Sequence, residues 1–165
     1  MSNVIDQSGL LAISTRLQRL SDLLRKDGQK IYEAYGIDFE PKWFPVVYTL
    51  HQKPLLSVSE IAAEIGYTHP STISLLRELE KKKLIRSKRD RNDERKRLLV
   101  LTDSGKSLID QMQPVWNTMV EALESLTDTE HKLMKAIEEV EQQMNTQSFY
   151  QRALLIKNKK NVDSR

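Results

Sequence analysis

Ten of the chain's 26 lysine and arginine residues lie within one segment of seventeen residues, Lys81–Arg97. Three acidic residues share this segment, which therefore carries a net charge of +7, although the whole 165-residue chain carries only +3. A basic concentration of this kind is typical of a surface that binds a polyanion. A solvated basic loop is the ordinary alternative. The segment directly follows a helix-turn-helix pattern, however, and this position favours nucleic acid.

The sequence offers little for catalysis or metal binding. It contains no cysteine, which excludes disulfides, thiolate zinc sites and thiol redox switches. Its three histidines, His51, His69 and His131, have no metal-ligand spacing. We find no glycine-rich phosphate loop and no nucleophile motif. We therefore expect a protein that is not an enzyme and that uses no cofactor and no metal.

Composition indicates a helix-rich protein outside the membrane. Only five glycines and five prolines occur, which favours long helices over many turns. No apolar run approaches membrane-spanning length, and the first residues lack a signal-peptide core. We expect a soluble, cytoplasmic protein.

Two short helices are predicted immediately before the basic segment. Residues Ser57 and Glu60 form a capping box, and Gly66 can close that helix in the left-handed conformation. Thr68 is a good N-cap for the next helix, with Pro70 in its first turn. The apolar spacing of this second helix predicts a buried face of Thr72, Leu75, Leu76 and Leu79. Together the two helices predict a helix-turn-helix.

The basic segment itself predicts a β-hairpin. Residues 84–88 and 98–101 have the character of short strands, and the residues between them are polar and charged. A hairpin that follows a helix-turn-helix is a wing.

Amphipathic helices are predicted before the helix-turn-helix. The apolar spacing of residues 8–35 predicts one long helix, with Ser8 as its cap and Gly36 as its end. A short helix follows at about 43–52 and ends before Pro54.

Long helices are also predicted after the wing. Thr102 can cap a helix at about 103–126, which Pro114 should kink or split. A second capping box, residues 127–130, begins a final helix at about 128–157. The predicted fold class is mainly α with a small β wing, namely a winged helix-turn-helix flanked by long N- and C-terminal helices.

Residues 57–105 resemble the MarR family of bacterial transcription regulators. The resemblance rests on three motifs in order: LEKKKLI, the pair Asp93-x-Arg95, and LTDSG at residues 101–105. It implies a single MarR-like chain over 1–165, with dimerisation helices at 8–36 and 103–158. The winged DNA-binding region would be 43–102. One departure is Lys83, which stands where the family usually has glycine.

The helical spacing predicts that the remaining positions of the second helix, Glu78 among them, face outward, and most of these positions are candidates for DNA contacts in the major groove. Arg77 suits either a bidentate contact to guanine or a phosphate contact. Ile73 suits a thymine methyl group or packing at the rim of the core. The candidate residues of this helix are Thr68, His69, Pro70, Ser71, Ile73, Ser74 and Arg77.

The wing is the second candidate DNA-binding element. An arginine at a hairpin tip can enter the minor groove, and Arg95 is the first choice for this role. The family pattern implies that Asp93 orients this arginine through a salt bridge. The candidate wing residues are Lys88, Arg89, Arg91, Asp93, Arg95 and Arg97.

The family resemblance also implies an effector pocket between the dimerisation helices and the winged region. Its candidate lining residues, for which core packing is the alternative, are Tyr32, Tyr35, Trp43, Phe44, Val47, His51 and Trp116.

The function that these observations favour is a sequence-specific transcription regulator. We expect a homodimer on a pseudo-palindromic operator in double-stranded DNA, acting as a repressor that a small-molecule effector releases. The alternatives are an activator, a non-sequence-specific architectural DNA-binding protein, and a winged-helix module for protein–protein contacts. The sequence specifies neither the operator nor the effector.

Overall fold

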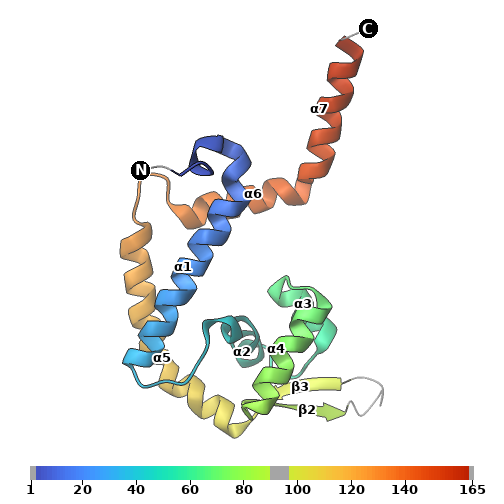
Figure 1. The fold of residues 1–165 in the computed structure, drawn as a ribbon. Helices are drawn as coiled ribbons and strands as arrows, with labels where there is room; N and C mark the ends of the chain where they lie inside the picture. Colours follow the sequence, from blue (N-terminus) through green and yellow to red (C-terminus); the bar gives the residue numbers. More distant parts are fainter. Residues whose placement is uncertain (1–2, 90–96, 164–165) are drawn as a thin grey trace. The chain divides into compact units, whose positions relative to one another are not determined.

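The chain is described from a computed structural model, over residues 3–89 and 97–163 (Figure 1). It divides into two compact units, Met1–Asn117 and Thr118–Arg165. The first unit contains η1 (Asp6–Ala12), α1 (Ile13–Ala34), η2 (Pro41–Trp43), α2 (Phe44–Gln52), β1 (Leu56–Ser57), α3 (Val58–Ile65), α4 (His69–Lys81), β2 (Ile85–Arg89), β3 (Arg97–Leu101) and the first part of α5 (Asp103–Thr127). The second unit contains the end of α5, α6 (Leu133–Thr146) and α7 (Phe149–Asp163).

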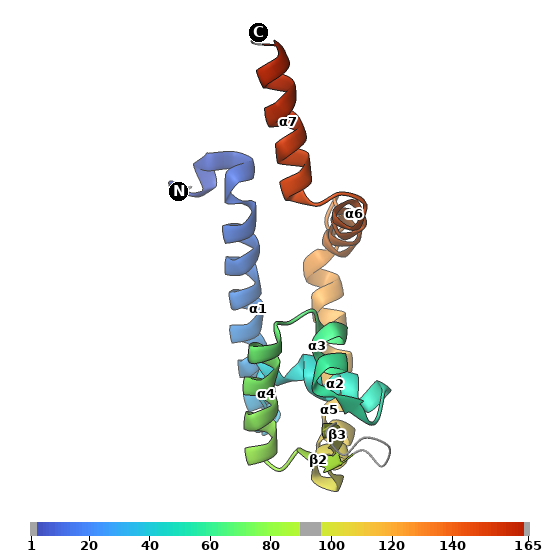
Figure 2. The ribbon, with the colours of Figure 1, turned by 90° about the vertical axis from the view of Figure 1, so that its right-hand side faces the viewer.

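The helix-turn-helix forms as the sequence predicts. At the start of α3 the Ser57 hydroxyl accepts a hydrogen bond from the Glu60 amide (3.3 Å), and the Glu60 carboxylate accepts one from the Ser57 amide (2.7 Å). Gly66 ends α3 with a φ of 68°. The Thr68 hydroxyl caps α4 by accepting from the Ser71 amide (3.4 Å). Helices α2, α3 and α4 pack together, and β2 follows directly after α4 (Figures 1 and 2).

The wing strands belong to an antiparallel sheet in the order β1-β3-β2. Strand β1, which pairs Leu56 with Leu99, was not predicted because two residues carry no alternation pattern. In the β2–β3 ladder Ile85 pairs with Leu101, and Ser87 pairs with Leu99. One face of this ladder is buried at Ile85, Leu99 and Leu101. This face packs against the core, with β3 in contact with α2 and β2 in contact with α4.

The core of the first unit is formed by side chains from all of its helices. Its fully buried members include Phe39, Trp43, Val46, Val47, Leu50, Ile61, Leu79, Ile109, Met112 and Val115. Burial of each such side chain contributes about 1.5–3 kcal/mol. The predicted inner face of α4 is confirmed, since Thr72, Leu75, Leu76 and Leu79 are all buried.

The N-terminal helix differs from the prediction. It does not begin at Ser8: residues 6–12 form the 3-10 segment η1, and the α-helix begins at Ile13. The reason is Gly9, whose φ of 61° and ψ of −130° lie outside the helical region. The Ser8 hydroxyl donates to the Ile5 carbonyl (2.7 Å) and caps nothing. Helix α1 ends at Ala34, close to the end predicted at Gly36, and Gly36 has a φ of 68°.

The C-terminal helices also differ from the prediction. Residues 127–130 do not form a capping box, because Thr127 is still in α5 and its hydroxyl donates to the Leu123 carbonyl (2.7 Å). The expected single helix over 128–157 is instead α6 and α7. A capping box that the sequence analysis missed begins α7, where Ser148 and Gln151 bond each other's backbone amides (2.9 and 3.2 Å). Pro114 lies inside α5 and does not split it.

None of the helices in the described ranges is both long enough and apolar enough to cross a membrane. Within the same ranges, no three histidine, aspartate or glutamate side chains are grouped in a way that could hold a metal ion.

Candidate nucleic-acid interface

The outer face of α4 presents the residues that the sequence analysis selected. Thr68, His69 and Pro70 begin this exposed face, and Ser71, Ser74 and Arg77 continue it along the helix. Ile73 is half-buried, which fits its position at the edge of the core face. The Thr68 hydroxyl donates to the Ser71 hydroxyl (2.9 Å), so the cap also orients Ser71. The exposed face of α4 therefore carries mainly small and polar side chains and one arginine.

Glu78 does not belong to this outer face, although the sequence suggested that it did. Its carboxylate accepts a hydrogen bond from Trp43 Nε1 (2.9 Å) and pairs with Lys42 Nζ (2.7 Å). The hydrogen bonds from Lys42 and then Trp43 stabilise the charged form and hold the pKa of Glu78 below its ordinary value. The contact therefore ties α4 to the segment before α2.

Helix α4 ends in a Schellman motif. The Lys83 amide donates to the Glu80 carbonyl (2.9 Å), and the Leu84 amide donates to the Leu79 carbonyl (3.0 Å). Lys83 occupies the left-handed position of this motif with a φ of 59°. The lysine thus adopts the conformation for which a glycine would be suited.

The LTDSG motif secures the end of α4 to the start of α5. The Thr102 hydroxyl contacts the carbonyls of Lys83 (2.6 Å) and Leu84 (3.1 Å) and accepts from the Gly105 amide (3.0 Å). A Cβ at position 105 would lie 2.2 Å from the Leu84 carbonyl oxygen. Only glycine allows this approach, so the motif has a structural role that its sequence did not reveal.

The base of the wing carries three of the predicted DNA contacts, Lys88, Arg89 and Arg97. Lys88 is exposed on β2. Arg97, at the start of β3, bonds the carboxylate of Glu80 on α4 and the hydroxyl of Ser87 on β2. Arg89 pairs in register with Arg97 at the last described rung of the ladder. The predictions for Arg91, Asp93 and Arg95 lie outside the described residues.

The candidate effector residues fall into two groups. Tyr32, Trp43 and Val47 are buried, and the rings of Tyr32 and Trp43 both pack edge-on against Phe39. This group belongs to the core, the alternative that the sequence left open. Burial raises the pKa of the Tyr32 hydroxyl, to which Trp116 Nε1 donates a hydrogen bond (2.9 Å).

The second group lies at the surface. Phe44 stacks on Tyr48 with ring centroids 5.2 Å apart, and both rings meet Trp116 edge-on. Phe44 and Tyr48 are 38% and 42% exposed. Tyr48 was missed, although its position four residues after Phe44 on one helix could have indicated the pair. Tyr35 and His51 are exposed.

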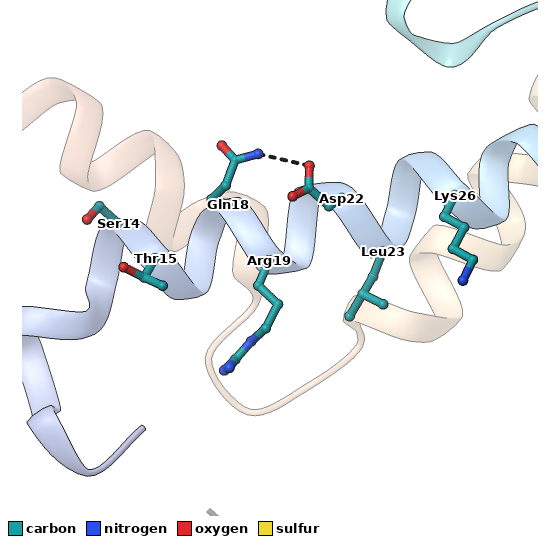
Figure 3. A pocket seen from close by; sticks show the side chains of 7 residues that line it. All are labelled: Ser14, Thr15, Gln18, Arg19, Asp22, Leu23 and Lys26. Atoms are coloured by element: carbon teal, nitrogen blue, oxygen red, sulfur yellow. Dashed lines mark hydrogen bonds between the residues drawn. The ribbon is translucent and has the colours of Figure 1, made fainter. Parts of the chain in front are cut away.

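One further surface depression lies on α1 alone. Its lining residues are Ser14, Thr15, Gln18, Arg19, Asp22, Leu23 and Lys26, and Gln18 donates to Asp22 (2.8 Å; Figure 3). One helix cannot enclose a ligand, so this is the polar side of α1 and not a binding cavity.

Comparison with known proteins agrees with this architecture. The sequence model of the MarR family matches residues 36–96. A curated relative in Bacillus subtilis (strain 168), the uncharacterised HTH-type transcriptional regulator YwaE, is 26% identical over 129 residues, which cover 77% of this chain and 74% of YwaE.

Two solved structures share the fold. The transcriptional repressor CouR, bound to a 23-mer DNA duplex, is 20% identical, with a TM-score of 0.68 and coverage of 88% of this chain and 98% of CouR. The PcaV regulator from Streptomyces coelicolor, in complex with its natural ligand, is 19% identical, with a TM-score of 0.65 and coverage of 86% and 98%.

The capped helix-turn-helix and the wing strands, together with these matches, define the chain as a winged-helix DNA-binding transcription regulator. The family model over residues 36–96 and the similarity to YwaE agree with the predicted resemblance to the MarR family.

Proposed function

We propose that this protein is a homodimeric repressor that binds a pseudo-palindromic operator and leaves it when a small molecule binds. Operator binding is proposed because α4 has an exposed polar face and is followed directly by basic residues on the first strand of the wing. A recognition helix in the major groove reads base edges, whereas basic residues beside it bind phosphates and set the register.

The proposed division of roles follows from exposure. Ser71, Ser74 and Arg77 face outward from the N-terminal and middle turns of α4, where base edges are reached. Lys88 is exposed and suits a phosphate contact. Arg95 keeps its proposed place in the minor groove, on the strength of the sequence pattern alone.

The homodimer is proposed because long helices carry apolar surface with no cover in the monomer. On α1 the side chains of Ile13, Leu17, Leu20 and Leu24 are 37–54% exposed. No residue described between Thr118 and Asn161 is buried, although α5, α6 and α7 carry many apolar side chains there. Helices without a core of their own require another surface to cover them. These helices, within 8–36 and 103–158, are the proposed dimerisation elements, with 43–102 as the DNA-binding region.

An effector is proposed from the surface cluster of Phe44, Tyr48 and Trp116, which offers edges and faces for an aromatic ligand. Trp116 of α5 also donates a hydrogen bond to Tyr32 of α1, so a ligand that moved Trp116 would change the contact between α5 and α1. The PcaV structure contains a natural ligand, which supports this part of the proposal. We place the protein in the cytoplasm, where its promoter DNA would lie.

The decisive experiment is selection of genomic fragments by the purified protein, followed by affinity measurements on the selected duplex and on random DNA. We expect the selected site to bind at least about a thousandfold more tightly than random DNA. Equal affinities would refute sequence-specific regulation and favour the architectural alternative. Promoter activity with and without the gene then separates a repressor from an activator.

The dimer is tested by sedimentation of Leu17→Arg and Thr15→Arg. Both substitutions introduce the same charge at exposed positions of α1, but Leu17 lies in the apolar stripe and Thr15 lies on the polar side (Figure 3). We expect only Leu17→Arg to give monomers. A dimeric Leu17→Arg would refute the proposed interface.

A further inference from the structure

Three side chains close a hydrogen-bonded loop between the recognition helix and both strands of the wing. Arg97 of β3 donates to both oxygens of the Glu80 carboxylate and to the Ser87 hydroxyl. Ser87 of β2 donates in turn to Glu80 (2.8 Å). We call Glu80, Ser87 and Arg97 the wing clasp. Each member has its partners inside the clasp, so α4, β2 and β3 are held by side chains as well as by the chain connection.

The faces of the ladder explain why Arg97 turns toward the protein. Successive residues of a strand point to opposite faces. Arg97 therefore shares a face with Leu99 and Leu101, which are buried, and this face looks toward α4. Arg86 and Lys88 lie on the opposite face, where both are exposed. The two faces thus separate arginine and lysine residues that the sequence presents as one basic block.

The electrostatics of Glu80 favour a persistent contact. Its side chain is only 24% exposed, against 52% for Arg97. Burial by itself raises the pKa of Glu80, but the hydrogen bonds from Arg97 and Ser87 and the charge of Arg97 outweigh it and hold the pKa below its ordinary value. A phosphate would have to take Arg97 from a carboxylate that already accepts two hydrogen bonds from it.

We propose that the wing clasp sets the position of the wing relative to the recognition helix, and that Arg97 serves operator binding as a positioning residue instead of a phosphate contact. The two elements must reach adjacent grooves at once, and an error of position at the base of the hairpin grows toward its tip. This inference rests on the proposed operator binding. It proposes for Arg97 a role other than the predicted DNA contact, and it gives Glu80 a role that the sequence analysis missed.

The test measures affinity for the selected operator duplex against salt concentration, for Glu80→Gln, Arg97→Met and the double variant. If the clasp positions the wing, each single change weakens binding about fivefold, and the double variant is no weaker than either single variant. The slope of log Kd against log salt stays that of the wild type. The control Glu64→Gln removes the same charge from another surface ion pair, with Lys53, and should leave affinity unchanged.

A phosphate contact at Arg97 predicts the opposite pattern. Arg97→Met would then reduce the salt slope by about 0.9, and Glu80→Gln would tighten binding because it releases the arginine and removes a negative charge. Either result would overturn the proposal while leaving operator binding intact.

Amide hydrogen exchange of the DNA-free protein tests the clasp independently of any operator. We expect peptides covering 85–89 and 97–101 to exchange about fivefold faster in Glu80→Gln and Arg97→Met, with α1 unchanged. Unchanged exchange in both strands would overturn the clasp even if the variants bind DNA poorly. A wild-type protein that selects no duplex would instead refute the proposed function, and with it the role of the clasp in binding.

Discussion

Replacing Lys83 by glycine should stabilise the protein. Lys83 has a φ of 59° in the Schellman motif that ends α4, and its side chain is exposed. A residue with a Cβ in this conformation costs about 1–2 kcal/mol. Glycine avoids that cost, but it has greater conformational freedom in the unfolded chain, and losing this freedom on folding reduces the stability by about 0.5–1 kcal/mol. The expected net gain in the free energy of unfolding is about 0.5–1 kcal/mol, or about 1–4 °C in Tm for a chain of this size.

The surrounding bonds predict that the gain is realised without rearrangement. The motif is already complete, since the amides of Lys83 and Leu84 bond the carbonyls of Glu80 and Leu79. Leu79 and Leu84 are both buried, as the hydrophobic contact of such a motif requires. Glycine therefore has only to occupy a backbone position that the fold already imposes.

Thermal and urea unfolding at one fixed protein concentration provide the assay, because a dimer's Tm depends on concentration. Lys83→Ala is the matched control: it removes the same charge, keeps a Cβ and should give no gain. Lys81→Gly, inside the last turn of α4, should lose about 1 kcal/mol. If Lys83→Ala stabilised the protein as much as Lys83→Gly, repulsion among neighbouring lysines would be the cause and the conformational argument would be refuted.

Other predictions follow from single contacts. Gly105→Ala should cost about 2 kcal/mol in urea unfolding, because its Cβ would collide with the Leu84 carbonyl, and a neutral result would contradict that approach. Trp116→Phe should cost about 1 kcal/mol by leaving the buried Tyr32 hydroxyl without its donor, and Tyr32→Phe in the same background should restore part of the loss. The folded state lowers the pKa of Glu80, so its charged form stabilises the protein above the ordinary carboxyl pKa and loses this effect as pH falls through the lower, folded-state value. The stability difference between wild type and Glu80→Gln should therefore shrink between about pH 5 and pH 3, and a constant difference would contradict it.

Local signals predicted the helix-turn-helix correctly because its determinants act over three or four residues. The capping box at Ser57, the left-handed Gly66 and the cap at Thr68 all stand where the residue types place them. The core face of α4 followed from helical spacing alone. The same kind of signal gave a wrong prediction near the C-terminus. Residues 127–130 have the sequence of a capping box, but Thr127 remains in α5, and the capping box is formed instead by Ser148 and Gln151 at the start of α7.

The candidate site was predicted in outline but not in its partners. Exposure of Ser71, Ser74 and Arg77 agrees with the predicted outer face, because a buried stripe on a helix determines which positions remain. Glu78 was assigned to that face incorrectly, since its partner Trp43 lies thirty-five residues away in the sequence. Contacts between residues so far apart in the sequence produce no periodic pattern from which they could be predicted.

The sequence by itself determined that a helix-turn-helix precedes a hairpin of high positive charge, because capping, spacing and charge are properties of neighbouring residues. Only the tertiary structure decided which way the described basic residues at the base of the wing face. Strand register sets Lys88 on one face and Arg97 on the other, and the end of α4 brings Glu80 to Arg97. The same fold imposes a left-handed backbone on Lys83. The residue types determine where charges lie along the chain. The partner of each charge depends on contacts between segments that come together only when the chain folds.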